Sequence, residues 1–472
     1  MEKIKFGADG WRAIIGKEFT TENVARVSEA VAKWLLSKRE SSSTSLSVVL
    51  GHDCRFGGEL FTQTVAKVLI DKGITVYKAN GFVSTPMISL GTVKRKADLG
   101  IIITASHNPS EYNGYKLKGH YGGPLLPEQV TEIENLIPEK SSSDISNLTI
   151  NSSLLKPVDL ESEYCKQIQK KFDLKLINSI SKSFAYDAMY GSGQNVIRRL
   201  LPKTTLIHCS ENPSFEGIAP EPIAKNLKEI SSTIKKSKNK LISGLATDGD
   251  ADRIGIIDNK GNFIDSHHLI LLLIHYLCKY KKMKGKVVMA FSVTPRVKKM
   301  CEHYNLQLQV VKIGFKHICE IMIREDVLIG GEESGGIAIK GHIPERDGIW
   351  IGLTIWEFMA KSGKSIKDLI AEVYAITGSF AFERNDLHLT EEVKNKIVDN
   401  CQHNRFNHFG IYKVKQLDNL DGWKYYFNDS EWLLIRASGT EPVLRTYAES
   451  SNQKNAFKIL IAAKKSLLEN NN

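Results

Sequence analysis

The chain has 472 residues, and domains of about 100–200 residues predict roughly three or four of them. A hydrophobic fraction of 42% and a charged fraction of 25% are typical of a globular protein with packed cores and exclude global disorder. The net charge is +11, but the lysine-rich stretches 235–240 and 279–286 contain a single aromatic residue, Tyr280, and no nucleic-acid motif accompanies them. We therefore expect a solvated lysine-rich surface and no nucleic-acid partner, and the positive field would still help to steer a phosphorylated substrate.

Membrane association is not expected either. The longest apolar run, 269–277, contains His275 and falls short of the roughly 20 residues that cross a bilayer. The first residues lack the apolar core of a signal peptide, so we expect a cytoplasmic location. The seven cysteines are scattered without a CxxC pair, which indicates reduced, mostly buried thiols rather than a disulfide framework or a zinc ribbon.

The first third of the chain alternates helices and strands. Thr20 or Thr21 would cap a helix with one apolar face, which is formed by Val24, Val27, Val31, Trp34 and Leu35. A second helix is predicted at 59–72, and apolar strands at 46–51, 74–79 and 99–104. Apolar strands that alternate with helices indicate a parallel sheet covered on both faces.

Further regions follow a polar, Ser-rich segment at 139–153, which is predicted to be a linker or an exposed crossing. The second region starts near Pro157 and ends with two strands around an acidic turn. The third region alternates again, with helices at 266–280 and 294–304 and strands at 286–291, 308–313 and 327–331. Beyond Gly378 the strands become amphipathic, which indicates a smaller α+β domain with a final helix near 453–468. The predicted domains are 1–150, 155–258, 259–376 and 378–472.

A serine lies on the loop that follows the apolar strand 99–104, in the segment TASHNPSEYNGYKLKG (104–119). Ligands gather beyond the carboxyl ends of strands in parallel α/β sheets, so the Ser106 hydroxyl could accept a phosphoryl group there and give it away. His107 follows directly, and Lys116 lies ten residues further on. A serine that caps an ordinary loop is the alternative.

An acidic turn carries Asp248, Asp250 and Asp252 with small residues between them. Carboxylates at this spacing can converge on one cation, and Mg²⁺ prefers few hard oxygen ligands plus a phosphate oxygen. A calcium EF-hand is excluded because its sixth and twelfth positions hold Arg253 and Asn259 instead of Gly and Glu. A solvated acidic hairpin is the alternative, but repulsion among the carboxylates favours a positive group among them.

Two later loops suit a sugar phosphate. In the stretch 330–336, glycines flank Glu332 and Ser334, which could hold sugar hydroxyls; no GK[ST] follows, so it is not a Walker loop. A second loop could clamp a phosphate dianion through arginines, hydroxyls and glycine-exposed backbone, at Arg436, Ser438, Gly439, Thr440 and Arg445. An ordinary turn is the alternative for each loop.

Together these loops closely resemble the α-D-phosphohexomutase superfamily, which includes phosphoglucomutase and phosphomannomutase. TASHNP, DGDADR, GGEESGG and RASGTEP match its four signature loops in order, and FGADGWR and DAMYGSG are similar to two further signatures. The resemblance covers essentially the whole chain. It implies an α/β fold of three consecutive α/β domains with mixed sheets plus a smaller α+β C-terminal domain, around a central cleft.

The resemblance also implies a mutase that interconverts hexose 1-phosphate and hexose 6-phosphate. Ser106 would carry the phosphoryl group and complete the coordination of Mg²⁺ by the three aspartates, with glucose 1,6-bisphosphate as intermediate and activator. Lys116 and Arg12 are the candidate bases, and a lysine base requires a pKa lowered by burial or by neighbouring cations. His107 would support the serine loop. The enzyme is expected to be a monomer or a homodimer.

For substrate binding, the resemblance assigns the sugar hydroxyls to Glu332 and Ser334 and the phosphate to the Arg436 loop, with Arg253 near the reacting group. GFK (314–316) and GHIPERDG (341–348) are similar to stretches of phosphoglucomutases, which favours glucose phosphate and adds Lys316 to the substrate-binding set. Related loops have a histidine where this chain has Gly336, and His342 or Arg346 could take that role.

Other activities stay open at this point. Phosphomannomutase or dual activity is the nearest alternative because no residue is identified that distinguishes mannose from glucose at C2, and phosphoglucosamine mutase activity is less favoured. A catalytically silent sugar-phosphate-binding homologue and a magnesium phosphatase are further alternatives. A silent homologue usually lacks the serine or a metal carboxylate, and this chain retains Ser106 and all three aspartates.

Overall fold

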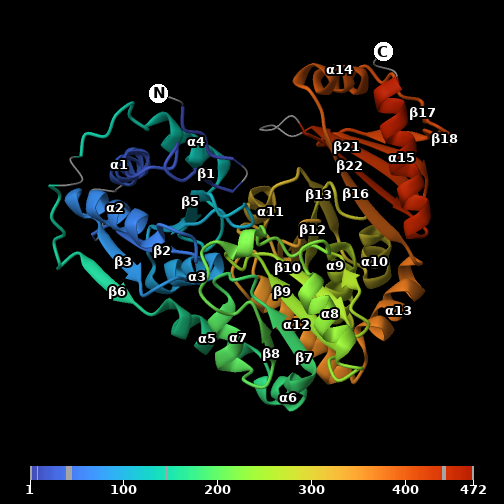
Figure 1. Ribbon diagram of the computed structural model, residues 1–472, viewed down its shortest axis with the longest axis horizontal. Helices are drawn as coiled ribbons and strands as arrows, with labels where there is room; N and C mark the ends of the chain where they lie inside the picture. Colours follow the sequence, from blue (N-terminus) through green and yellow to red (C-terminus); the bar gives the residue numbers. More distant parts are fainter. Residues whose placement is uncertain (1–2, 8, 39–44, 144–146, 438–442, 470–472) are drawn as a thin grey trace. The chain divides into compact units, whose positions relative to one another are not determined.

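The computed structural model describes residues 3–7, 9–38, 45–143, 147–437 and 443–469 (Figure 1). The chain forms two compact units. The first unit comprises Met1–Val288 and Gly314–Ile370, and the second comprises Met289–Ile313 and Ala371–Asn472. Among the described residues, no helix combines the length and the apolar character that spanning a membrane requires. All seven cysteines are buried free thiols, as predicted.

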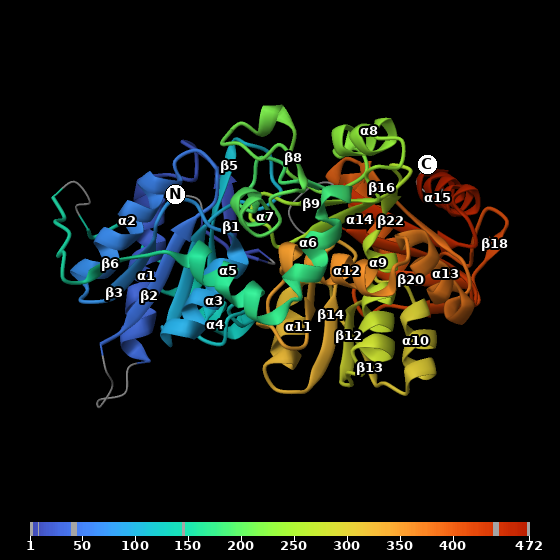
Figure 2. The ribbon, with the colours of Figure 1, turned by 90° about the horizontal axis from the view of Figure 1, so that it is seen from below.

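The first unit begins with a six-stranded sheet in the order β1-β5-β4-β2-β3-β6. Val48 and Leu50 of β2 belong to the core that packs under α1 and α2, whereas Val49 and Gly100 lie beside residues of α3. Figure 2 shows the backbone of this sheet with α1, α2 and α3 around it. The elements are β1 (Trp11–Ile14), α1 (Thr21–Ser37), β2 (Ser47–His52), α2 (Gly58–Asp71), β3 (Thr75–Ala79), α3 (Thr85–Arg95), β4 (Leu99–Ile103), β5 (Tyr112–Gly119), α4 (Pro127–Asn135), β6 (Leu155–Val158) and α5 (Leu160–Lys171).

The predicted strands 46–51, 74–79 and 99–104 correspond to β2, β3 and β4, which are parallel to one another as expected. The sheet as a whole is mixed, as the resemblance implies. β2, β3, β4 and β6 are parallel, but β5 is antiparallel to both β4 and β1. Only residues 104–111 connect β4 to β5. A parallel crossover needs a dozen or more residues, so the chain must turn back here. The serine loop is therefore a hairpin connection at the carboxyl end of β4.

The helix predicted after Thr20 is confirmed. Thr20 Oγ1 accepts a hydrogen bond from Asn23 N at 3.2 Å at the start of α1, and the predicted apolar face is buried. α1 also holds the start of the Ser-rich segment, because Glu29 accepts hydrogen bonds from Ser141 Oγ at 2.7 Å and Ser143 N at 2.9 Å. The first residues of that segment are therefore attached to α1 rather than freely exposed.

A second, five-stranded sheet has the order β11-β10-β9-β7-β8. β9 and β10 are antiparallel, and the acidic turn joins them. The elements of this part are α6 (Leu174–Ile180), β7 (Phe184–Asp187), α7 (Gln194–Leu200), β8 (Thr205–Ile207), α8 (Lys228–Lys236), β9 (Ser243–Thr247), β10 (Ile254–Asp258) and β11 (Phe263–Ile264).

A third part of the chain supplies the sugar loop. β14 and β15 form an antiparallel hairpin, and the predicted sugar-binding residues lie in its turn. The N-terminus of α12 follows shortly after, capped by Asp347, which accepts from Trp350 N at 2.9 Å. The elements are α9 (Ser266–His275), β12 (Lys286–Ala290), α11 (Phe315–Met322), β14 (Val327–Gly331), β15 (Ile337–Ile339), α12 (Gly348–Ser362) and α13 (Ile366–Thr377).

The second unit is built on an antiparallel sheet in the order β16-β22-β21-β20-β19. Lys424 is buried in this unit and donates to the carbonyl oxygens of Phe291 and Val293 at 3.1 and 3.3 Å, which explains why residues 289–313 belong to it. Its elements are α10 (Arg296–Tyr304), β13 (Leu308–Val311), β16 (Ala381–His388), α14 (Glu391–Gln402), β17 (His408–Phe409), β18 (Tyr412–Lys413), β19 (Gln416–Asp418), β20 (Trp423–Asn428), β21 (Glu431–Ala437), β22 (Val443–Ser450) and α15 (Gln453–Glu469).

Candidate active site

Ser106 lies in the hairpin loop after β4, directly against the acidic turn. Its Oγ donates a hydrogen bond to Asp248 Oδ2 at 2.7 Å, and His107 Nδ1 lies 3.4 Å from the same hydroxyl oxygen. The backbone of Ser106 has φ of 54°, a left-handed conformation that is unfavourable for a residue other than glycine. The predicted proximity of the serine hydroxyl to the aspartates is thus present within the first unit.

The acidic turn brings its carboxylates together. Oxygens of Asp248, Asp250 and Asp252 all lie within 4.8 Å of one another, and all three residues are buried. Burial raises the pKa of Asp248 well above its ordinary value, and the charges of Asp252 and Asp250 raise it further. Burial also acts to raise the pKa of Asp250, but Lys116 outweighs it and the net shift is downward.

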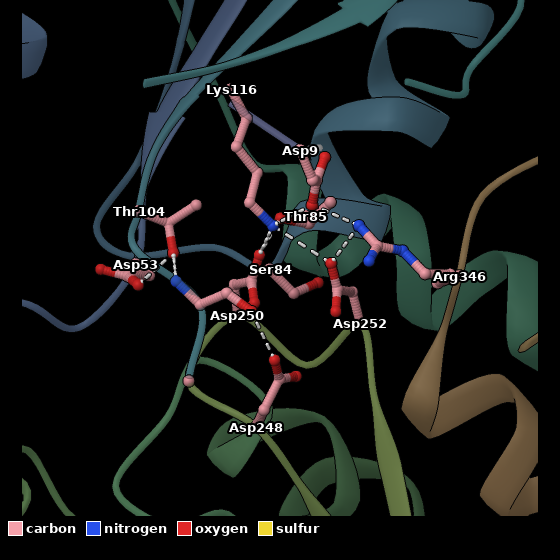
Figure 3. Close-up of polar contacts among 12 residues, drawn as sticks. Asp9, Asp53, Ser84, Thr85, Thr104, Lys116, Asp248, Asp250, Asp252 and Arg346 are labelled. Atoms are coloured by element: carbon pink, nitrogen blue, oxygen red, sulfur yellow. Dashed lines mark hydrogen bonds and ion pairs between the residues drawn. The ribbon is translucent and has the colours of Figure 1, made fainter. Parts of the chain in front are cut away.

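Lys116 is the positive group among these carboxylates, as the repulsion argument predicts. Its Nζ lies 2.7 Å from Asp250 Oδ2, 3.1 Å from Asp252 Oδ2 and 2.7 Å from Asp9 Oδ2 (Figure 3). Burial alone would lower the pKa of Lys116, but the three carboxylates raise it well above its ordinary value. The prediction that burial or neighbouring cations depress this pKa is wrong, because the neighbours of Lys116 are anions.

The carboxylates also have capacity left for a cation. Within the described part of the chain, the buried oxygens Asp250 Oδ1 and Asp252 Oδ1 have no hydrogen-bond partner. Buried carboxylate oxygens without partners are costly, whereas hard divalent cations prefer such ligands. The three carboxylates therefore fit a divalent cation, and the Ser106 hydroxyl is hydrogen-bonded to one of them, Asp248.

Arg346 is a second cation beside these carboxylates. Its guanidinium Nη2 lies 2.7 Å from Asp252 Oδ2 and also pairs with Asp9 (Figure 3). Gly336 makes room for it, because a Cβ at that position would lie 2.5 Å from Arg346 Cδ. Arg346 thus lies beside Gly336, the position at which related loops have a histidine.

The sugar loop contributes a buried carboxylate. Glu332 Oε1 accepts from Gly314 N at 3.0 Å, and Arg346 Nη1 lies 3.9 Å from Glu332 Oε2. Burial raises the pKa of Glu332 to about 7, although Arg346 acts in the opposite direction. Ser334 and Lys316 are both half-buried on the same unit.

Two further predicted site residues are Arg12, which contacts the serine loop, and His107, which is part of it. Arg12 Nη1 donates to Asn108 Oδ1 at 2.8 Å, which attaches β1 to this loop. Burial lowers the pKa of His107 well below its ordinary value, and Arg253 and Arg12 lower it further. The imidazole of His107 is therefore neutral near pH 7.

Arg253 and His342 have different surroundings. The backbone N of Arg253 donates to Asp248 Oδ1 at 2.9 Å, and its Nε lies 4.0 Å from Asp252 Oδ1. His342 instead contacts two residues at the start of α12: its Nε2 is 2.8 Å from Asp347 Oδ2, and its ring stacks on Trp350 with centroids 3.7 Å apart. The structure thus brings Arg253 to the aspartates, while the contacts of His342 are with the start of α12.

The predicted phosphate clamp belongs to the second unit, where Ser438, Gly439 and Thr440 lie outside the described residues. On the flanking strands, Arg436 of β21 stands directly opposite Arg445 of β22. Like charges at directly opposed positions are destabilising unless an anion accompanies them. Among the described residues, Asp421 Oδ1 lies 3.4 Å from Arg436 Nε, and Asp386 of β16 stands directly opposite Arg445. The pair of arginines is consistent with an anion site.

Sequence reasoning missed several residues that hold the site together. Asp9 pairs with Lys116, Lys118 and Arg346, and Thr85 donates to Asp250. Asp9 lies within the stretch FGADGWR, so the motif marked the segment but not the role of its carboxylate. Nothing in the local sequence around Thr85 indicates its partner, which lies far away in the chain.

Models of one protein family match the chain along most of its length. They follow one another in order: "Phosphoglucomutase/phosphomannomutase, alpha/beta/alpha domain I" at residues 3–144, domain II at 162–261, domain III at 265–376, and the C-terminal domain at 392–460. The four matches confirm three α/β domains followed by a separate C-terminal domain.

Individual relatives cover nearly the whole chain. A probable phosphoglucosamine mutase from Methanosphaera stadtmanae is 30% identical over 454 residues, 95% of each chain. A phosphoglucomutase/phosphomannomutase from Thermococcus kodakarensis is 29% identical over 460 residues, 96% of each chain. The crystal structure of a putative phosphomannomutase from Thermus thermophilus is 31% identical, with a TM-score of 0.87 and 99% of each chain covered. The chain therefore belongs to the phosphoglucomutase/phosphomannomutase family of the α-D-phosphohexomutase superfamily, and it is a phosphohexomutase.

Proposed function

We propose that this enzyme interconverts glucose 1-phosphate and glucose 6-phosphate with Ser106 as the phosphoryl carrier. The observation that carries the proposal is the 2.7 Å hydrogen bond from Ser106 Oγ to Asp248, beside two further carboxylates that fit a divalent cation. Glucose 1,6-bisphosphate is the proposed intermediate and activator, and Mg²⁺ the proposed cation.

The proposed reaction has two transfers. The bond between phosphorus and Ser106 Oγ breaks as a bond between phosphorus and the oxygen of the free sugar hydroxyl forms. The sugar hydroxyl gives up its proton and Ser106 Oγ gains one to become a hydroxyl again, so the number of protons is unchanged. The bisphosphate then turns over, and its other phosphoryl group returns to Ser106. Mg²⁺ bound by the aspartates would polarise the phosphoryl oxygens and stabilise charge as it develops.

The chain's own residues would hold the reacting group. The raised pKa of Lys116 supports a role as a cationic donor to phosphoryl oxygens over a role as the general base. Arg12 would assist, since its guanidinium already contacts the serine loop through Asn108. Glu332 and Ser334 are the proposed partners of the sugar hydroxyls, and Arg436 and Arg445 of the substrate's phosphate.

The choice of hexose rests on the sugar loop. The stretch GEES (331–334) favours glucose phosphate by its likeness to phosphoglucomutases. The Methanosphaera relative is named a probable phosphoglucosamine mutase, so glucosamine phosphate is the second candidate. The kcat/KM values for the 1-phosphates of glucose, mannose, glucosamine and N-acetylglucosamine decide between them, and a higher value for glucosamine would overturn the glucose assignment.

The carrier role has a direct test. Intact-mass measurement should find one phosphoryl group on the wild-type chain after incubation with glucose 1,6-bisphosphate and Mg²⁺, and none on Ser106→Ala. Ser110→Ala is the matched control, because Ser110 is a half-buried serine of the same loop without a place in the proposed chemistry. A phosphoryl group that persists in Ser106→Ala would refute the proposal. Release of inorganic phosphate without isomerisation would indicate a phosphatase.

A further inference from the structure

Arg55, between β2 and α2, binds the serine loop through backbone carbonyl groups. Its Nη2 donates to the carbonyl oxygens of Ser106 and Asn108, both at 2.6 Å. Its Nη1 donates to those of Pro109 and Tyr112, at 2.7 and 3.1 Å. One guanidinium therefore binds three carbonyl groups of the serine loop and that of Tyr112, the first residue of β5.

The same short segment also holds the Ser106 amide. Asp53 accepts a hydrogen bond from Thr104 Oγ1, and Thr104 Oγ1 accepts one from Ser106 N at 2.9 Å (the Asp53–Thr104 contact is drawn in Figure 3). Asp53 Oδ2 lies 3.3 Å from Arg55 Nε. Residues 53–55 thus hold both backbone polar groups of Ser106. Arg55 binds its C=O directly, and Asp53 binds the Thr104 hydroxyl that accepts from its N–H.

The chemistry of this contact requires arginine. Four carbonyl dipoles that converge on one point repel one another, and buried carbonyls need donors. A guanidinium offers five N–H groups in a fixed plane, while a lysine ammonium offers three on a flexible stem. The Arg55 side chain is fully buried, and its guanidinium lies 4.9 Å from the centroid of the Phe215 ring, so its plane is also constrained.

We propose that Arg55 is a positioning residue of the mutase: it fixes the serine loop so that Ser106 stays in its left-handed conformation with Oγ toward Asp248. The left-handed φ costs free energy and persists only where surrounding contacts enforce it. Without those contacts the loop would relax and move Oγ away from the aspartates. This inference rests on the proposed carrier role of Ser106.

Arg55→Lys is the primary test, with Arg26→Lys as the matched control. Arg26 is also a buried arginine of the same sheet region, and it donates to the carbonyl oxygen of Pro138 at 2.7 Å, away from the serine loop. For Arg55→Lys, we expect kcat for glucose 1-phosphate to fall about 100-fold, because a displacement of about 1 Å at a reacting atom has that effect. KM should stay within about threefold, since Arg55 touches no substrate group. Arg26→Lys should retain kcat even if its Tm falls.

A second variant covers the case in which Arg55→Lys does not fold. Thr104→Val keeps Arg55 but removes the acceptor for Ser106 N, and the loss of this one hydrogen bond should lower kcat by about tenfold. Thr104→Ser, which keeps the hydroxyl, should restore most of that loss. A general packing defect would not be restored in this way, because serine is smaller than valine.

The outcomes separate the two hypotheses. A wild-type enzyme that carries no phosphoryl group on Ser106 overturns the carrier role and this inference together. A phosphorylated wild type combined with an Arg55→Lys variant of normal kcat overturns the inference alone. Equal losses of kcat in Arg55→Lys and Arg26→Lys, in proportion to their losses of Tm, overturn it as well.

Discussion

Replacing Arg346 with methionine should lower the free energy of unfolding of the first unit by about 3 kcal/mol. Arg346 lies within 4 Å of four carboxylates: Asp252 at 2.7 Å, Glu345 at 3.6 Å, Glu332 at 3.9 Å, and Asp9 in direct contact. Methionine retains packing against Phe315, whose ring centroid lies 5.4 Å from the guanidinium carbon, but removes the charge.

The size of this loss in unfolding free energy depends on which cations remain beside each carboxylate. Removing one partner of a buried ion pair costs about 3–5 kcal/mol when the other charge is left alone. Here Asp9 and Asp252 still contact Lys116, and Glu345 still has Lys118 at 2.8 Å. Among the described residues, only Glu332 is left without a cation within 4 Å. The expected loss therefore lies at the lower end of the range.

The assay is urea unfolding followed by fluorescence and circular dichroism, with Arg324→Met as control. Arg324 pairs with Glu320 at 3.2 Å, but the two side chains are 64% and 38% exposed, so its removal should cost no more than about 1 kcal/mol. Unfolding midpoints that coincide for Arg346→Met and Arg324→Met would contradict the reasoning. They would mean that solvent compensates the buried charges as well as the guanidinium does.

Three further predictions concern pH and packing. Burial raises the pKa of Glu332 to about 7, so kcat/KM should increase as the pH rises through that value and the carboxylate forms. In Glu332→Gln, this increase of kcat/KM with pH should be absent. The hydrogen bond to Asp187 raises the pKa of His208 from 6.5 to about 9, so its stabilising effect should be full below pH 6.5 and lost as pH rises through about 9. The Tm difference between wild type and His208→Asn should accordingly shrink at high pH, and a constant difference would contradict this. Gly336→Ala should destabilise the enzyme by about 1–3 kcal/mol by displacing Arg346, and Arg346→Met in the same chain should relieve most of that cost; strictly additive effects would exclude the contact.

Local patterns predicted those parts of the fold that local physics decides. Burial imposes a characteristic spacing of apolar residues in the helix after Thr20 and in the apolar strands, and this spacing predicted them. Their bounds in the structure differ from the predicted ones by a few residues. The direction of β5 was not predicted as antiparallel, because it depends on the length of the connection after Ile103 rather than on the strand's own composition.

The site likewise has residues that short segments of sequence predict and residues whose roles depend on distant partners. Ser106 and the three aspartates were predictable because their spacing and residue types carry the chemistry within short segments. The direction of the pKa shift of Lys116 was not, since it is set by Asp250, Asp252 and Asp9, all far from Lys116 in sequence, and only the fold brings these carboxylates to its ammonium group. Arg55 was missed for a related reason: its partners are backbone carbonyls, and backbone groups leave no trace in side-chain motifs.

Small residues between the aspartates have a structural explanation of the same kind. Three successive carbonyl groups of the acidic turn accept hydrogen bonds from three separate segments: Gly249 O from Ser192 N at 2.9 Å, Asp250 O from Thr85 N at 3.0 Å, and Ala251 O from Gly348 N at 3.0 Å. A Cβ on Gly249 would lie 2.5 Å from the Ser106 carbonyl oxygen, so glycine lets the serine loop approach. Because the backbone of the turn is held by its neighbours, the alternating carboxylates are free to converge on the other side. The spacing of the aspartates therefore forms a cation site only in combination with those distant donors, which is why an acidic turn of the same composition alone does not specify one.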